Sequence, residues 1–559
     1  MKEQKKISLA TFVLILMILV LLCCLIIFII STQDNKKQEE NKVVNEAISD
    51  VENNTSSDII NDNDEENKIT NNKTGDYISE FDISFLKLEN EKVNKIYSPL
   101  SIKYALKMLE EGATGESKMQ ISKIIGNSGI TKYNSSSNLS LANALFVRDT
   151  FEKSIKDEYK DTLQEKYDAE VIVDSFANAD TVNTWVSNKT LNLINNMLES
   201  IGEDKNFLLV NALGIDMEWA NKFLKQGGVE CYYEHENFWW HTAEQVTSFK
   251  FGEDEQLVSG MEIIASINNY NIVDELGKEN IKKTVGEEFK KWAKNLNEND
   301  YEYNDIFNGD LSEENIELKL EQYLEGGKYY SDYESKGYIS ELDSNYKRVD
   351  KSTDFSLYVD DNVKAFAKDL KEYNGTTLQY IGIMPVNKEL DDFVKNADEK
   401  EINTIISNLK ELITENFKDG VVTKITGYIP KFKFEYDLKL KEDLAKIGIT
   451  DVFEEGKANL TELSDEENIY ISDAVHKANI EFTQDGIKAA AATMFGGAGA
   501  GDSFDYIYEV PVEEIDLTFD KPYMFIIRDK ETGEIWFTGT VYEPLLWENE
   551  PEKDNAGRY

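Results

Sequence analysis

Ser98 and His476 are the two residues that could act as nucleophile and general base of a hydrolase triad, with an aspartate as third member. The surroundings of Ser98 argue against this chemistry. No Gly-x-Ser-x-Gly turn is present to expose Ser98 at the end of a strand. Ser98 instead precedes Pro99 and an amphipathic pattern, which is typical of a helix cap. The sequence therefore predicts no catalytic residue.

Metal and disulfide chemistry have few candidate ligands in this chain. Cys23 and Cys24 lie in an apolar run, which leaves Cys231 as the third and last cysteine. His235 and His241 follow Cys231, but their spacing matches no common zinc motif. One cysteine outside the apolar run also forms no intrachain disulfide. We therefore expect no metal site and no cofactor.

The most unusual stretch runs from Gln484 to Gly501 and reads QDGIKAAAATMFGGAGAG. Its four consecutive alanines favour a helix, but the flanking glycines deny that helix stable ends, so we expect a loop. With a period of two residues, one face of this loop is uncharged and small or apolar. That face consists of Ile487, Ala489, Ala491, Thr493, Phe495, Gly497 and Gly499. Such a face is suited to burial in a sheet, which is unusual for a loop, and a flexible Gly/Ala linker is the alternative.

Charge excludes one broad class of partner. The 559 residues include 106 acidic and 60 basic side chains, which gives a formal net charge of −46. Such a chain repels phosphate backbones, so we expect no nucleic-acid partner. No run of Lys and Arg marks the early helices, so we also expect no heparin-like cofactor.

The N-terminal region predicts a membrane anchor. Ile7 to Ile30 is an apolar run of 24 residues without a charge, preceded by lysines, and it is long enough to cross a bilayer as a helix. Residues 1–31 are therefore interpreted as a cytoplasmic tip and an uncleaved transmembrane anchor. Residues 32–75 are polar with almost no aromatics, as in a disordered stalk. We expect a single-pass protein of the cell membrane whose soluble domain is extracellular.

Hydrophobic periodicity predicts a mixed α+β domain after the stalk. Helical spacing begins at Ile78, and Ser98 caps a second helix with Pro99 at its first position. Helical segments are expected to occupy much of the chain to about residue 200. Strands are expected at Phe207 to Ala212, Thr377 to Met384, Thr423 to Ile429, Tyr523 to Ile527 and Ile535 to Val541.

Between about residues 242 and 340 the sequence becomes acidic and rich in tyrosine, which we interpret as an insertion. Within it, Asn280 to Leu296 could form a helix. The insertion is either a solvated elaboration or an accessory surface that binds a partner.

Six motifs, in this order along the chain, resemble the serpin family of large single-domain protease inhibitors. They are NKIYSPLSIKYALKMLEEGATGES (Asn94 to Ser117), LANALFV (Leu141 to Val147), VNTWVSNKT (Val182 to Thr190), LLVNALGIDMEWANKF (Leu208 to Phe223), AVHKANIEFTQDGIKAAAAT (Ala474 to Thr493) and DKPYMFIIRDKETGEIWFTGTVYEP (Asp520 to Pro544). The resemblance implies a serpin domain at 76–548, interrupted by the insertion, with 549–559 as a C-terminal tail. It implies a large central mixed β-sheet, further sheets and about eight or nine helices.

The resemblance also implies roles for particular positions. Ser98, Ser101, Asn211 and His476 match the family's shutter, a hydrogen-bonded cluster beneath the centre of the main sheet. Trp219 matches the tryptophan at the top of that sheet, where the reactive loop begins to enter. The hinge of that loop is matched by Gly486, Ile487, Lys488, Ala489, Ala490, Ala491, Ala492 and Thr493.

The mechanism that the resemblance implies is a suicide trap for a serine protease, or alternatively a cysteine protease. The protease forms an acyl-enzyme on the loop, and the cut loop then enters the sheet before water can release the enzyme. The hinge departs from the family pattern at Ile487, where Thr or Ser is common, and at Lys488, where Glu is common. These departures keep open a non-inhibitory serpin that acts as a cell-surface binding or adhesion module through the insertion.

The family register places the attacked bond at Ala500–Gly501. Small residues there favour an elastase-like or subtilisin-like target. The loop is longer than the family pattern by about ten residues, so Phe504, Tyr506 or Tyr508 could be recognised instead by a chymotrypsin-like protease.

Overall fold

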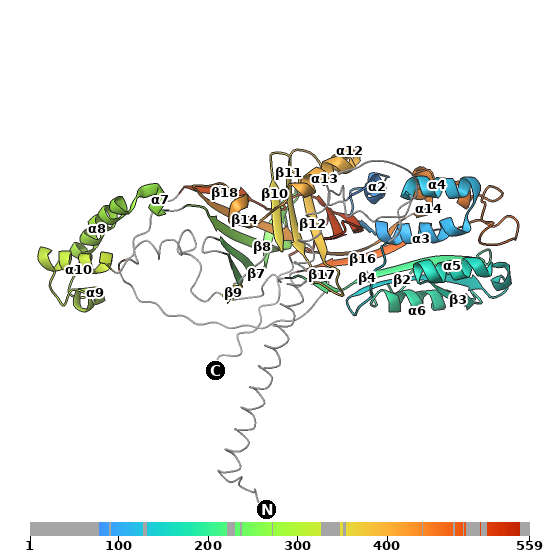
Figure 1. Cartoon of the computed structure of the whole chain (residues 1–559), viewed down its shortest axis with the longest axis horizontal. Coiled ribbons are helices and arrows are strands. Elements are labelled where there is room, and N and C mark those ends of the chain that lie inside the picture. Colours follow the sequence, from blue (N-terminus) through green and yellow to red (C-terminus); the bar gives the residue numbers. More distant parts are fainter. Residues whose placement is uncertain are drawn as a thin grey trace, which may run out of the picture. The chain divides into compact units, whose positions relative to one another are not determined.

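Four β-sheets organise the part of the chain that the structure describes (Figure 1). The computed structural model describes residues 78–88, 91–126, 131–220, 230–234, 238–270, 272–325, 347–349, 354–438, 440–472, 474, 476–483, 486–487, 504 and 511–547. All of them belong to the compact unit Thr74–Tyr559. The predicted anchor, stalk and C-terminal tail lie outside these residues. Within the ranges just given, no helix is long and apolar enough to cross a membrane.

The largest sheet is antiparallel and has seven strands. In spatial order these are β1 (Lys95–Tyr97), β20 (Ile535–Val541), β19 (Tyr523–Asp529), β12 (Leu378–Pro385), β11 (Val363–Asp369), β10 (Phe355–Val359) and β13 (Lys410–Glu411). Every residue of β12, β19 and β20 is buried, because their apolar and β-branched side chains pack on both faces. Three of the predicted strands are confirmed here.

A six-stranded sheet contains the start of the predicted insertion. Its strands are β18 (Val512–Asp516), β14 (Val422–Pro430), β8 (Gln256–Asn268), β7 (Phe238–Phe251), β6 (Glu230–Glu234) and β9 (Lys347–Val349), in spatial order. β8 pairs with both β14 and β7, so it is an internal strand of the sheet. The predicted insertion, at about residues 242–340, overlaps this sheet at its start, because the chain leaves the sheet only after Asn268.

The expected α+β fold with a large sheet and further sheets is confirmed, and the two remaining sheets are smaller. One contains β3 (Glu170–Asp174), β2 (Leu139–Arg148) and β4 (Phe207–Ile215), and the other β15 (Phe432–Leu438), β16 (His476–Phe482), β17 (Gly486–Ile487) and β5 (Met217–Glu218). β4 and β5 follow each other along one stretch of chain, so this stretch contributes to both sheets.

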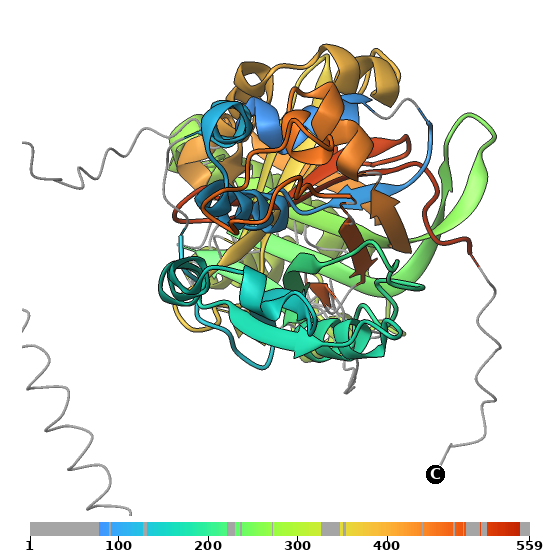
Figure 2. The ribbon, with the colours of Figure 1, turned by 90° about the vertical axis from the view of Figure 1, so that its right-hand side faces the viewer.

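Twelve α-helices are present in the described residues, more than the eight or nine expected. They are α2 (Glu80–Leu88), α3 (Pro99–Gly112), α4 (Gly115–Ile125), α5 (Asp157–Tyr167), α6 (Asp180–Lys189), α7 (Ile272–Leu276), α8 (Lys278–Asn295), α9 (Tyr301–Asp305), α10 (Glu313–Glu325), α12 (Leu390–Asn396), α13 (Glu399–Ser407) and α14 (Leu440–Lys446). α3 packs against α4, and α6 packs on β2 and β4 (Figure 2). The predicted helices that begin at Ile78 and Pro99 are confirmed as α2 and α3. Helices α2 to α6 occupy much of the chain up to residue 200, as expected, and the strands β1, β2 and β3 lie between them.

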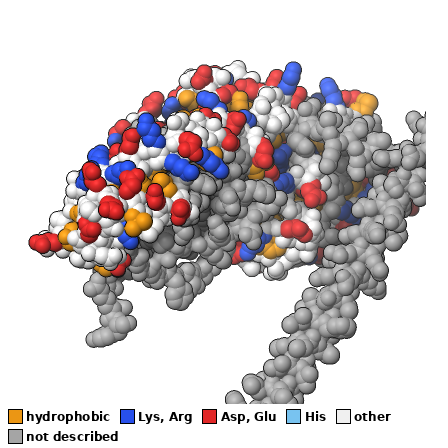
Figure 3. All heavy atoms as spheres, turned by 60° about the vertical axis from the view of Figure 1, so that its left-hand side comes forward, with side chains coloured by type: hydrophobic (Ala, Val, Ile, Leu, Met, Phe, Trp, Pro, Cys, Tyr) orange, Lys and Arg blue, Asp and Glu red, His pale blue; other side chains and the backbone are white. Residues whose placement is uncertain are grey.

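We call α7 to α10 (residues 272–325) the helical segment, and it accounts for the additional helices. Its core contains Phe289, Ala293, Phe307, Ile316 and Leu320, which are buried. Ion pairs join Lys290 to Glu317 and Lys294 to Glu313 across α8 and α10. Acidic and basic side chains therefore alternate over the outer face of this segment (Figure 3). The expected helix from Asn280 to Leu296 is confirmed as α8.

Candidate functional site

A slot lies between β4 and β16. No strand pairing joins β4 to β16 in the part of the chain that the structure describes. A narrow cavity of about 20 Å³ separates residues 211–215 of β4 from residues 476–479 of β16. A second cavity of about 310 Å³ adjoins it, and its lining includes Ile102, Ala105, Leu106 and Leu109 of α3 and Phe207 and Leu209 of β4. The apolar face of α3 thus lines the cavity that adjoins the slot.

The two faces of β4 lead to different surroundings. Phe207, Leu213 and Ile215 point into the main core of the domain. Val210 and Ala212 belong to a second cluster with Trp185 of α6. Odd-numbered positions of β4 therefore face the core beneath the slot, and even-numbered positions face α6.

The predicted hinge begins at the top of this slot. β17 pairs with β16 through Ile487 and Phe482, and with β5 through Gly486 with Glu218 and Ile487 with Met217. Its two residues are thus a short strand between β16 and β5. Thr483 closes the turn before β17 by donating its amide and its hydroxyl to the carbonyl of Gly486.

Glycine is required at residue 486 for two reasons. Its φ of 151° is rare for residues with a side chain, and a Cβ there would lie 2.3 Å from the Met217 carbonyl oxygen. The backbones of β5 and β17 can therefore lie this close together only because residue 486 is glycine.

Trp219 lies beside the same turn and is fully buried. Its indole Nε1–H donates to the carbonyl of Thr483 at 2.9 Å, and its ring meets Phe482 edge to face. The tryptophan that the resemblance placed at the sheet top is therefore in contact with the residues that lead into the hinge.

The four predicted shutter residues come together at the first turn of α3. Ser98 caps this helix, because its Oγ accepts the amide of Ser101 at 3.0 Å. The amide of Ser98 donates to Nε2 of His476 on β16 at 2.9 Å. The hydroxyl of Ser101 donates to Oδ1 of Asn211 on β4. One helix terminus thus bonds to both strands that border the slot.

Sequence reasoning missed the continuation of this cluster. Asn211 donates its Nδ2 to Oδ1 of Asn143 at 2.7 Å, and Asn143 donates its own Nδ2 to the carbonyl of Tyr167 at 2.8 Å. Asn143 and Asn211 are directly opposite each other on β2 and β4. A polar amide within the apolar motif LANALFV was the available signal.

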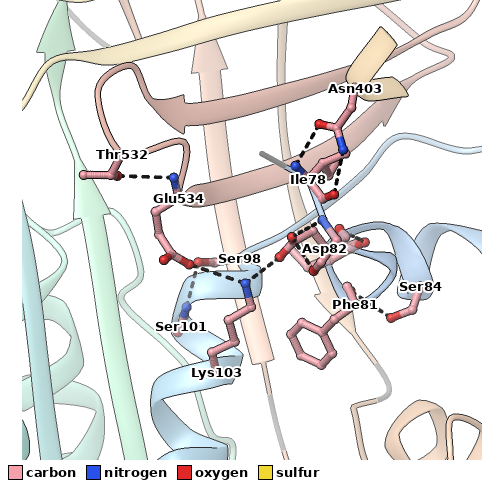
Figure 4. Close-up of polar contacts among 12 residues, drawn as sticks. Ile78, Phe81, Asp82, Ser84, Ser98, Ser101, Lys103, Asn403, Thr532 and Glu534 are labelled. Atoms are coloured by element: carbon pink, nitrogen blue, oxygen red, sulfur yellow. Dashed lines mark hydrogen bonds and ion pairs between the residues drawn. The ribbon is translucent and has the colours of Figure 1, made fainter. Parts of the chain in front are cut away.

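A charged group supports α3 one turn further on (Figure 4). Lys103 Nζ lies 2.8 Å from Oδ1 of Asp82 and 3.4 Å from Oε1 of Glu534. Burial alone would lower the pKa of Lys103, but the two carboxylates raise it above its ordinary value. Burial raises the pKa of Glu534. α3 is thereby fixed to α2 and to the β19–β20 hairpin.

This geometry does not form a hydrolase triad. His476 accepts the backbone amide of Ser98, whereas the Ser98 hydroxyl oxygen accepts from Ser101. Both side chains are buried. A nucleophile needs its own hydroxyl bonded to the base and open to substrate.

Other predicted positions lie outside the described residues. These are Lys488, Ala489, Ala490, Ala491, Ala492, Thr493, Ala500, Gly501 and His235. In the ranges that the structure covers, no group of three or more His, Cys, Asp or Glu side chains could hold a metal ion.

Known proteins are similar in sequence to most of the chain. The family described as Serpin (serine protease inhibitor) matches residues 78–250 and 349–544, more than half of the chain. Neuroserpin from Mus musculus is 23% identical over 482 residues, which cover 81% of this chain and 87% of neuroserpin. Leukocyte elastase inhibitor from Xenopus tropicalis is 24% identical over 477 residues, which cover 81% of this chain and 94% of that protein.

Solved structures agree in fold. The native state of the thermophilic serpin tengpin has a TM-score of 0.54 at 20% identity and covers 87% of this chain and 97% of its own. Thyroxine-binding globulin in complex with thyroxine has a TM-score of 0.51 at 16% identity and covers 83% and 97%.

The close approach at Gly486 yields a first prediction. Gly486→Ala should expel β17 from its place beside β5, because the new Cβ overlaps the Met217 carbonyl. We expect faster hydrogen exchange at the Thr483 amide and a loss of about 1–3 kcal/mol in the free energy of unfolding. Gly456→Ala is the matched control, since Gly456 also has a positive φ but no atom within 4 Å. Equal exchange at Thr483 in both variants would contradict the role of Gly486.

The shutter yields a pH prediction. Burial lowers the pKa of His476 from 6.5 to about 4, so between these values the unfolded chain binds a proton that the native chain does not. This contribution to stability is complete above pH 6.5 and falls as the pH drops through the window, by on the order of 3 kcal/mol. Urea unfolding of wild type and His476→Asn between pH 4 and 7.5 measures it. The variant should lose less stability over this window, and identical slopes would refute the assignment.

Proposed function

Because the chain belongs to the serpin family, we propose that it is a suicide-type inhibitor of serine, or cysteine, endopeptidases. Its cleaved loop enters the slot between β4 and β16 as a new strand. One observation carries this proposal: β17 already occupies the top of a slot that no other described strand fills.

The observed pairing defines a register for the new strand. Ile487 faces Met217 on one side and Phe482 on the other. Continuing this antiparallel register four residues further brings Ala491 between Leu213 and Ala478, which both belong to the main core. Two residues later, Thr493 reaches the level of Asn211 and His476. The uncharged face of the loop thereby coincides with the face of β4 that points into the core.

The same register accounts for the lysine in the hinge. One residue after Ile487, Lys488 falls between Asp216 on one side and Glu481 on the other. Residues directly opposite each other in a sheet have Cβ atoms about 5 Å apart, within reach of an ion pair. A lysine at this position is therefore compatible with strand insertion in this chain, and its departure from the family pattern does not by itself argue for a non-inhibitory protein.

The larger cavity suits the one bulky residue of the inserting face. In the extended register Phe495 lies opposite Leu209, which lines the cavity of about 310 Å³ above α3. Burying an aromatic ring against the apolar part of this lining contributes about 2–3 kcal/mol to the inserted state. Phe495 would thus fit the cavity, and its burial would stabilise the inserted state of the loop.

Insertion would move the bound protease a long way, and it would do so before the acyl bond is hydrolysed. A strand of 14 residues, from Ile487 to Ala500, spans roughly 46 Å at about 3.3 Å per residue. An enzyme attached at Ala500 would be carried that far before water hydrolyses the acyl bond. The small residues around Ala500–Gly501 favour elastase-like or subtilisin-like targets. We further propose that Ile7 to Ile30 anchors the protein in a cell membrane with the inhibitor domain outside.

Ile487 is the feature that favours the alternative function. An apolar residue replaces the usual Thr or Ser at the first inserting position, as stated for the family resemblance above. If insertion is too slow, the protein is a cell-surface binding module that proteases merely cut.

The inward face provides the main test. Ala491→Arg places a charge between Leu213 and Ala478, where desolvation without a partner costs several kcal/mol. We expect cleavage of the loop by an elastase-like or subtilisin-like protease to continue while the SDS-resistant complex disappears. Ser503→Arg adds the same charge beyond the expected bond and should keep the complex. Equal complex formation by Ala491→Arg and wild type would contradict insertion, and no complex with wild type would favour the alternative function.

Lys488 provides an independent test. Lys488→Glu would put a carboxylate between those of Asp216 and Glu481 in the inserted strand, and like charges in facing positions cost up to about 1 kcal/mol each. The melting temperature should rise strongly when the wild-type loop is cut, and by several degrees less in Lys488→Glu. Lys488→Ala should fall between the two. If cleavage raises all three melting temperatures equally, the proposed register is wrong.

A further inference from the structure

Phe504, four residues beyond the expected reactive bond, lies in an aromatic cage of the helical segment. Its ring centroid is 5.0 Å from that of Phe289, 5.2 Å from Trp292 and 5.5 Å from Tyr323. The rings of Phe289 and Tyr323 meet it edge to face, an arrangement that aromatic quadrupoles favour. Three rings from α8 and α10 thus surround one residue of the reactive loop.

The contacts of Phe504 extend to the start of α8. Phe504 also packs against the buried Ile281 and Val285 of α8, as do Tyr270 and Val273. Tyr270 follows the end of β8, and Val273 belongs to α7. Phe504 therefore packs against α8 both near its start and further along the helix, and against α10.

Strand order explains how the loop reaches this segment. Asn268, where β8 ends, is paired with Val422 of β14, and Val422 is paired with Val512, where β18 begins. These three residues form one row across the six-stranded sheet. The helical segment leaves the sheet from the first residue of this row, and the reactive loop returns to the sheet at the last. Phe504 lies eight residues before Val512, within easy reach of an extended chain.

From this juxtaposition we propose that the helical segment is the receptor for the C-terminal half of the reactive loop, with Phe504 as its anchor. The segment withholds Phe504 from proteases that have a deep aromatic pocket, and it leaves Ala500–Gly501 as the accessible bond. This selectivity rests on the proposed inhibitory function. The docking itself does not.

The cage gives the segment a role that a solvated elaboration would not have. A decorating element needs only its own core, which Phe289, Phe307 and Leu320 supply from within. Trp292 and Tyr323 are half-buried, and each contacts Phe504 in addition to rings of the segment itself. Because Phe504 lies beyond the expected bond, cleavage at Ala500 would leave it attached to the segment while the preceding residues depart.

The first experiment maps cleavage by chymotrypsin. Proteolysis of a docked residue follows the fraction of time it is released, so the bond after Phe504 should be cut slowly in wild type. Tyr323→Ala removes one wall of the cage and should speed this cut about tenfold. Tyr301→Ala is the matched control, since Tyr301 is 72% exposed on the same segment. Mass spectrometry identifies the cut, and equal rates of cleavage after Phe504 in wild type and Tyr323→Ala would overturn the proposal.

A second experiment tests the docking with a substitution outside the helical segment. Phe504→Ala leaves α8 and α10 intact in sequence but exposes Trp292, so the Trp292 fluorescence should shift to longer wavelength. Trp292→Phe identifies the contribution of this indole. Phe504→Leu, which refills the cage, should restore the wild-type emission, and Tyr506→Ala in the same loop should not change it. Unchanged emission in Phe504→Ala would overturn the docking.

The two proposals fail separately. Slow cleavage after Phe504 without any SDS-resistant complex would refute the inhibitory function and leave the docking standing. Complex formation together with fast cleavage after Phe504 would refute the receptor and leave the inhibitor standing.

Discussion

The facing edges of β4 and β16 are the constraint on which the rest of the structure depends. Each strand is paired on its outer side, with β2 and β15 respectively, and no pairing joins the two in the described residues. Backbone amides and carbonyls along such edges bind another strand readily. The first turn of α3 holds both edges, because Ser98 bonds to His476 of β16 and Ser101 bonds to Asn211 of β4. A strand that enters must therefore pass above a polar cluster that already fixes the width of the opening.

Local chemistry in the sequence was sufficient to predict much of this site. Ser98 before Pro99 indicated the cap that orients the α3 terminus, and the apolar runs that became β12, β14, β19 and β20 marked strands correctly. Family motifs supplied Asn211, His476 and Trp219, and the structure brings the first two to the start of α3 and the third to the turn before β17. These features depend on short sequence separations or on strong patterns, which is why they were accessible.

Pairing between strands that are far apart in the chain could not be predicted from sequence patterns in this way. β8 lies between β14 and β7, although its surroundings in sequence are acidic, because one of its two partners, β14, is more than a hundred residues away in the chain. The opening between β4 and β16, which no pairing joins in the described residues, also leaves no local trace in sequence. The contact of Phe504 with α8 and α10 is also invisible to pattern analysis, since a single aromatic residue in a loop has no period.

The short strand β17 bears on kinetics. In β-sheet formation the slow event is usually the closing of a loop that brings two distant backbones into register, after which each further residue adds with little entropic loss. Ile487 already faces both Met217 and Phe482, so that closure has taken place before any peptide bond is broken. Growth of the strand from this point resembles the zipping of a preformed nucleus, whose pace depends on the side chains that arrive next and hardly at all on a search for partners.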